Sequence, residues 1–163
     1  MLALVAALRT EIAGLLGPSR ARLEVREAHL TLWRGPLAGG PVLLAVTGVG
    51  RELATAGTRS LLERYRPSAL VNLGFAGALQ PELRPGDLVL ERRSSEVGTP
   101  PEGGAAPSPD RWVEADGELL RMAEQVAEEC GVPWTRGEGL TLPWAASTPE
   151  EKGRLAATAA LTV

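Results

Sequence analysis

The chain has 163 residues, 44% of them hydrophobic and 23% charged, a composition typical of a globular protein with one domain. Its formal net charge of −3 and scattered basic residues argue against binding to nucleic acid or to an anionic membrane. The single cysteine, Cys130, excludes an intrachain disulfide and argues against a metal site built from cysteines. The apolar N-terminal run is broken by Arg9 and Glu11 and is too short to span a bilayer, so we expect a cytoplasmic protein.

The first half of the chain alternates apolar runs with one clear helical pattern. Residues 2–8 form a continuous apolar run, as expected for a strand buried on both faces. Thr10 is the predicted cap of a short helix that follows. Leu53, Gly57 and Leu61 share one stripe of a helix predicted over 51–65. Further strands are predicted over 23–29, 30–34, 41–47 and 69–73.

The second half predicts a long loop over 94–109, which is rich in Ser, Gly, Pro and Glu. A helix follows, with Asp116 as its cap, Gly131 at its end and an apolar stripe that includes Met122 and Val126. The alternation of strands and helices predicts an α/β fold with a mixed, largely parallel sheet. We expect one domain over 1–163. Its other elements are strands over 86–90 and 139–142, a helix over 149–157 and the start of a strand over 160–163.

Glycines and one acidic residue follow three of the predicted strands. Ligands of an open α/β sheet bind beyond the carboxyl ends of its strands, where Glu11 and the segments 48–50 and 74–77 are expected. Glycine lets backbone N–H groups approach a ligand closely. Each of these segments is equally well explained as a tight turn, but together they favour a pocket.

Three segments carry a more specific pattern: residues 7–11, residues 46–50, and residues 67–79 continuing through 83–89. Residues 145–152 add a weaker match. In order and spacing they resemble the purine nucleoside phosphorylase and methylthioadenosine/adenosylhomocysteine nucleosidase family. The resemblance implies the family's phosphorylase/hydrolase-like α/β fold, a three-layer domain with a mixed, largely parallel sheet. The resemblance implies cleavage of the N-glycosidic bond of purine nucleosides such as methylthioadenosine or adenosylhomocysteine. It implies no cofactor, and phosphate only as the co-substrate of a phosphorylase.

The resemblance also assigns roles to individual residues. Nucleosidases of the family use an acidic residue at the Glu11 position to orient and deprotonate water, whereas phosphorylases tend to place an arginine there. Glu11 is therefore the candidate catalytic residue and favours hydrolysis; the alternative is a solvated glutamate in the first turn of a helix. No metal ligand is expected. The residues implied in substrate binding are Val49, Gly50, Phe75, Ala76, Gly77 and Trp144.

Two of these assignments carry an alternative. Phe75 departs from the family, in which nucleosidases commonly have a small hydroxyl residue near the nucleophile. Its ring would occupy that space or pack on the ligand. Trp144 lies near the region where family members place an aromatic side chain against the base, and packing in a core or an interface explains it equally well.

The resemblance places several family features beyond Val163: the ribose-binding Glu, the purine-protonating Asp, the last strands and the closing helix. Leaving-group protonation and sugar positioning depend on such groups, so weak intrinsic catalysis is expected. The alternative to an enzyme is a catalytically impaired remnant that binds nucleosides or only self-associates. A homo-oligomer that covers an exposed apolar face is expected in either case.

Overall fold

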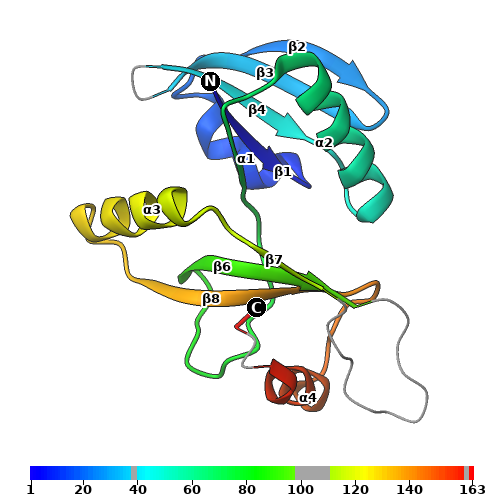
Figure 1. The fold of residues 1–163 in the computed structure, drawn as a ribbon, viewed down its shortest axis with the longest axis vertical. Helices are drawn as coiled ribbons and strands as arrows, with labels where there is room; N and C mark the ends of the chain where they lie inside the picture. The colour runs from blue at the N-terminus through cyan, green and yellow to red at the C-terminus, as the bar shows by residue number, and fades with distance from the viewer. Residues whose placement is uncertain (38–39, 98–110, 160–161) are drawn as a thin grey trace. The chain divides into compact units, whose positions relative to one another are not determined.

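The computed structural model describes residues 1–37, 40–97, 111–159 and 162–163, with strands and helices in two compact units (Figure 1). The first unit is Met1–Phe75 and the second is Ala76–Val163. Both combine helices with strands, which confirms the predicted α/β class and its mixed sheet. The expectation of one domain over 1–163 stays a prediction. Within the described ranges, no helix has the length and apolar character needed to cross a membrane.

The first unit contains a five-stranded mixed sheet in the order β2-β3-β4-β1-β5. β1 pairs in parallel with β4 and β5, whereas β2, β3 and β4 form antiparallel pairs. The carboxyl ends of the three parallel strands therefore meet at one edge of the sheet. The elements are β1 (Leu2–Ala6), α1 (Arg9–Leu16), β2 (Arg22–Glu27), β3 (Leu30–Leu37), β4 (Gly40–Val46), α2 (Arg51–Tyr65) and β5 (Ala69–Asn72).

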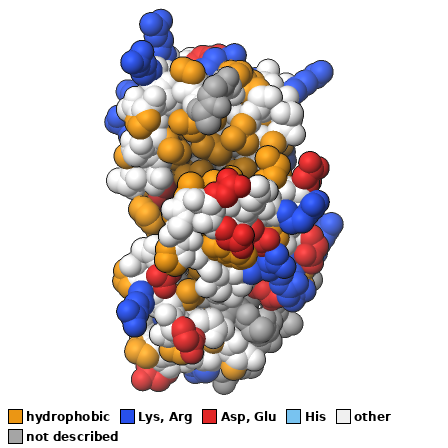
Figure 2. Space-filling model, turned by 90° about the vertical axis from the view of Figure 1, so that its left-hand side faces the viewer, with side chains coloured by type: hydrophobic (Ala, Val, Ile, Leu, Met, Phe, Trp, Pro, Cys, Tyr) orange, Lys and Arg blue, Asp and Glu red, His pale blue; other side chains and the backbone are white. Residues whose placement is uncertain are grey.

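Both faces of this sheet are apolar, because successive residues of a strand point to opposite sides. One face packs with Leu61 of α2, and the other packs with Ile12 of α1. Hydrophobic side chains also gather on the surface of the first unit that faces the viewer in Figure 2. The fully buried members of the two clusters include Leu30, Leu32 and Leu43 on one face and Ala6, Val42 and Leu44 on the other.

Gly57 of α2 is buried where the helix crosses the hairpin strands, and a side chain has no room there. A Cβ on Gly57 would lie 2.3 Å from the His29 carbonyl oxygen and 2.7 Å from Thr47 Cγ2. Gly57→Ala is therefore expected to lower the free energy of unfolding by about 1–3 kcal/mol, as overpacking does. Gly14 of α1 is the matched control, because no atom lies within 4 Å of its Cβ position. Urea unfolding should show that Gly14→Ala leaves the free energy of unfolding unchanged or raises it by up to about 1 kcal/mol. An equal loss of stability in both variants would contradict the close packing at Gly57.

The second unit contains a three-stranded sheet in the order β7-β6-β8. β6 pairs antiparallel with β7 and parallel with β8. The carboxylate of Asp116 accepts hydrogen bonds from the N–H groups of Glu118 and Leu119 at 2.9 and 3.0 Å, which confirms it as the cap of α3. The elements are β6 (Leu88–Glu96), β7 (Trp112–Glu114), α3 (Gly117–Glu129), β8 (Trp134–Thr141) and α4 (Pro149–Ala159).

Pairing between strands extends the sheet into part of the predicted loop. β6 continues to Glu96, which lies opposite Thr141 of β8. β7, which the sequence did not predict, pairs with the same stretch of β6. Ladder hydrogen bonds here outweigh the weak strand propensity of Ser and Glu. Residues 98–109 of the predicted loop and residues 160–161 of the predicted last strand lie outside the described residues. Thr162 and Val163 hydrogen-bond to the β8 backbone.

α3 forms as predicted, but its apolar stripe is only partly buried. Ala127 is buried, whereas Met122 and Val126 are 56% and 57% exposed. Glu124 lies on the buried side instead, because its carboxylate forms two hydrogen bonds of 2.7 Å with the Arg136 guanidinium of β8. This ion pair turns a charged side of the helix toward the sheet and leaves apolar side chains at the surface.

Candidate active site

Four of the predicted site residues lie where three strands of the first unit end side by side. The Gly48 N–H, after β4, donates to the Ala7 carbonyl oxygen after β1 at 3.1 Å. The Leu73 N–H, after β5, donates to the Val5 carbonyl oxygen at 2.9 Å. The backbone thus brings the loops that carry Glu11, Val49, Gly50 and Phe75 to one edge of the sheet, as expected for a site at the carboxyl ends of strands.

The Glu11 carboxylate is held by two backbone N–H groups from different loops. Its Oε2 accepts from the Leu8 N–H at 2.7 Å, and its Oε1 accepts from the Phe75 N–H at 3.1 Å. Leu8 is therefore the N-cap residue of α1, and Glu11 in the first turn holds its N–H. The prediction of Thr10 as the cap is wrong because α1 begins at Arg9 and includes Thr10. An ionised carboxylate has about four acceptor positions, so these two bonds leave capacity for a water molecule or a ligand hydroxyl.

Gly74 makes room for this carboxylate. A Cβ on Gly74 would lie 2.9 Å from Glu11 Oε1 and 3.3 Å from the carboxyl carbon. Any larger residue would push Glu11 away from the Phe75 N–H. The sequence pointed to glycine for the approach of a ligand, whereas the structure shows that Gly74 also admits a side chain from α1, a contact with no local sequence signal.

Two large apolar side chains are exposed on the loops at this edge of the sheet. Phe75 is 80% exposed and Val49 is 66% exposed. Gly48 and Gly50 flank Val49 with φ angles of +95° and +100°, a conformation that glycine adopts readily and other residues avoid. The edge therefore combines a fixed hydrogen-bond acceptor with an apolar surface. The role of the Phe75 ring toward a nucleophile or a ligand stays a prediction.

The other predicted residues lie in the second unit, where the first turn of α4 contacts two of them. The Trp144 Nε1–H donates to Glu151 Oε1 at 2.6 Å, and Glu151 Oε2 accepts from the Ser147 N–H at 3.2 Å. Lys152 follows Glu151, and its Nζ lies 3.6 Å from the Cβ position of Gly77. Ala76 is exposed next to Gly77. The sequence reasoning missed Lys152, although it is the only lysine of the chain.

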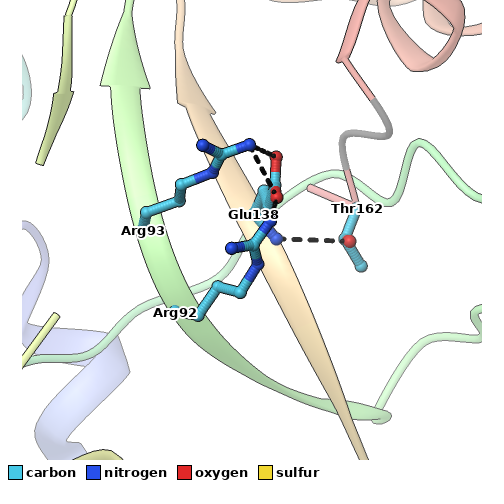
Figure 3. Close-up of polar contacts among 4 residues, drawn as sticks. All are labelled: Arg92, Arg93, Glu138 and Thr162. Atoms are coloured by element: carbon cyan, nitrogen blue, oxygen red, sulfur yellow. Dashed lines mark hydrogen bonds and ion pairs between the residues drawn. The ribbon is translucent and has the colours of Figure 1, made fainter. Parts of the chain in front are cut away.

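A charged cluster on β6 and β8 of the second unit was also missed. Glu138 of β8 is 6% exposed at its side chain and pairs with both Arg92 and Arg93 (Figure 3). A register shift between Glu91 and Arg93 places these two consecutive arginines beside one carboxylate, as a β-bulge does. The Arg93 guanidinium also lies 4.1 Å from the centre of the Trp112 ring. Burial raises the pKa of the neighbouring Glu91 carboxyl.

Two acidic side chains of the described residues differ in whether their carboxylates can accept a further hydrogen bond. Within that part of the chain, no group of three or more His, Cys, Asp or Glu side chains is arranged to hold a metal ion. Glu138 already forms ion pairs with two arginines of β6, so its carboxylate links neighbouring strands of the second sheet. Glu11 is the acidic group that lies at the carboxyl edge of parallel strands with acceptor capacity left.

Comparison with known proteins gives the same family from sequence. The sequence model of the Phosphorylase superfamily matches residues 2–158. The 5'-methylthioadenosine/S-adenosylhomocysteine nucleosidase of Tolumonas auensis is 35% identical over 130 residues, which are 77% of this chain and 54% of that protein. The protein of the same name from Haemophilus influenzae is 30% identical over 139 residues, which are 82% of this chain and 61% of that protein. The chain thus spans little more than half the length of the curated relatives it matches.

The fold is also found among solved structures. The crystal structure of the 5'-methylthioadenosine/S-adenosylhomocysteine nucleosidase from Neisseria meningitidis, in complex with methylthio-immucillin-A, matches with a TM-score of 0.85. The match covers 99% of this chain and 73% of that one at 21% identity. This likeness confirms the predicted fold.

Proposed function

Because this chain belongs to the phosphorylase superfamily, we propose that it cleaves the N-glycosidic bond of purine nucleosides, with Glu11 as the catalytic carboxylate. The observation that carries the proposal is the position of Glu11, which the N–H groups of Leu8 and Phe75 hold at the carboxyl edge of the first sheet. The names of the relatives at 35% and 30% identity support methylthioadenosine and adenosylhomocysteine as the substrates.

A fixed carboxylate suits this reaction in two ways. Cleavage of a glycosidic bond passes through a positively charged, oxocarbenium-like sugar, which a nearby negative charge stabilises. The same carboxylate accepts a proton from the attacking water. Since two backbone donors already orient Glu11, little reorganisation is needed during the reaction. A carboxylate also repels a phosphate ion, so we propose water as the nucleophile.

The residues that the resemblance implies in substrate binding are proposed to offer a nucleoside different contacts, and each unit is taken by itself. In the first unit, Val49 and Phe75 offer exposed apolar side chains, and Gly50 offers its backbone. In the second unit, Ala76 and Gly77 offer an open backbone. The Trp144 ring, held through its Nε1–H by Glu151, is proposed to stack on the purine base. A cytoplasmic location and self-association stay predictions.

Base release from purified protein tests the proposal. The protein is incubated with methylthioadenosine, adenosylhomocysteine, inosine or adenosine, with and without phosphate, and the free base is quantified by chromatography. We expect release of adenine from the first two compounds at a rate that phosphate does not change. Saturable nucleoside binding without turnover would contradict the proposed enzymatic activity and favour a non-catalytic nucleoside-binding protein. Absence of both turnover and binding would overturn the proposed function altogether.

A further inference from the structure

Lys152 lies beside Gly77 in the second unit, and its ammonium has no partner among the described residues. Its Nζ and Cε lie 3.6 and 4.0 Å from the position that a Cβ would occupy on Gly77. The side chain is half-buried. Among the described residues, nothing forms a hydrogen bond or an ion pair with this ammonium. A partly buried charge without a counter-ion is unfavourable, and it therefore attracts an anion.

The neighbouring carboxylate on α4 is already engaged. Glu151 precedes Lys152, but its two oxygens accept hydrogen bonds from the Trp144 Nε1–H and the Ser147 N–H. The half-buried arginine of the same unit, Arg93, does have a carboxylate partner in Glu138. Lys152 therefore differs from Arg93 in lacking a counter-ion within the described residues.

Gly77 leaves space next to the ammonium. A Cβ at 3.6 Å from Nζ would make ordinary van der Waals contact. Since Gly77 lacks that atom, no side chain covers this side of its backbone, and a ligand can approach the backbone and Nζ together. The backbone N–H groups of such a turn add hydrogen-bond donors for an anion.

We propose that Lys152 and the backbone of Gly77 form an oxyanion-binding subsite. An ammonium binds phosphate and carboxylate alike as a compact positive charge. The oxyanion is either inorganic phosphate or the carboxylate in the 5′ substituent of a nucleoside, as in adenosylhomocysteine. The second source rests on the proposed function; the binding of inorganic phosphate does not depend on it.

Phosphate binding to the full chain tests the subsite without any nucleoside. Titration calorimetry with inorganic phosphate compares the wild type with Lys152→Met, Lys152→Arg and the control Arg59→Met, which removes a positive charge from the exposed surface of α2. If phosphate is the source, Lys152→Met weakens binding about tenfold or more, as expected for a lost charge-assisted hydrogen bond. Lys152→Arg retains most of the affinity, and Arg59→Met leaves it unchanged.

A second arm compares adenosylhomocysteine, which carries a carboxylate, with methylthioadenosine, which does not. If the nucleoside supplies the oxyanion, Lys152→Met weakens adenosylhomocysteine binding about tenfold and leaves methylthioadenosine binding unchanged. If Lys152→Met binds phosphate and both nucleosides with the affinity of the wild type, the proposed subsite is wrong. This holds even if the binding of nucleosides supports the proposed function. Phosphate binding that depends on Lys152 in a protein that binds neither nucleoside supports the subsite and contradicts the proposed function.

Discussion

Glu11→Gln should reduce the rate of base release by at least about 100-fold, because a positioned general base contributes about 10²–10⁴-fold. Glutamine has no negative charge to stabilise the sugar cation and no basic oxygen to accept a proton from water. Its amide also satisfies only one of the two backbone donors at Leu8 and Phe75, since the NH₂ group is itself a donor. Chromatography of the free base from methylthioadenosine measures the effect.

The matched control is Glu52→Gln, which makes the same exchange in the first turn of α2. It is expected to keep the wild-type rate. Amide hydrogen exchange gives a second readout that does not require activity: in Glu11→Gln the N–H groups of Leu8 and Phe75 should exchange faster, because the carboxylate no longer holds both. Wild-type rates of base release in Glu11→Gln would rule out Glu11 as the catalytic carboxylate, whatever the exchange data show.

Removal of the Glu138 carboxylate should cause a large loss of stability in the second unit. Glu138 is 6% exposed at its side chain and neutralises two arginines. In Glu138→Ala, Arg93 would keep a partly buried charge without its counter-ion, and an orphaned buried charge costs about 3–5 kcal/mol. Because the Arg92 and Arg93 side chains are 45% and 27% exposed, water compensates in part, and we expect about 2–3 kcal/mol. Denaturant unfolding measures this loss.

Glu24→Ala is the control for burial. Glu24 also pairs with an arginine across neighbouring strands, with Arg34 Nε at 2.7 Å, but the two side chains are 36% and 45% exposed. Exposed pairs contribute about 0–1 kcal/mol, so this variant should unfold almost like the wild type. Equal losses in the two variants would mean that burial does not set the strength of the Glu138 cluster.

Local sequence patterns predicted the helices well. The helix over 51–65 has the bounds of α2, and Asp116 caps α3 as expected. Helix formation depends on residues within a few positions of one another, which a linear pattern contains. The buried parallel strands were also recognisable, because a strand covered on both faces is apolar throughout.

Contacts between distant residues were not predictable in this way. β7 forms only because β6 offers it a pairing edge. Arg92 and Arg93 share Glu138 because a register shift in β6 turns both toward β8. Such register and pairing depend on the packed sheet, whereas a local pattern reports only propensity.

The candidate site shows the same division. Residue type and position after an apolar strand were enough to single out Glu11 and the glycine-rich turn that begins at Gly74. The hydrogen bond from the Phe75 N–H to Glu11, and the position of Lys152 next to Gly77, arise only when separate segments meet in the folded chain. A carboxylate or an ammonium acts through what lies within a few ångströms of it, and for these groups the neighbours come from elements far apart in the sequence.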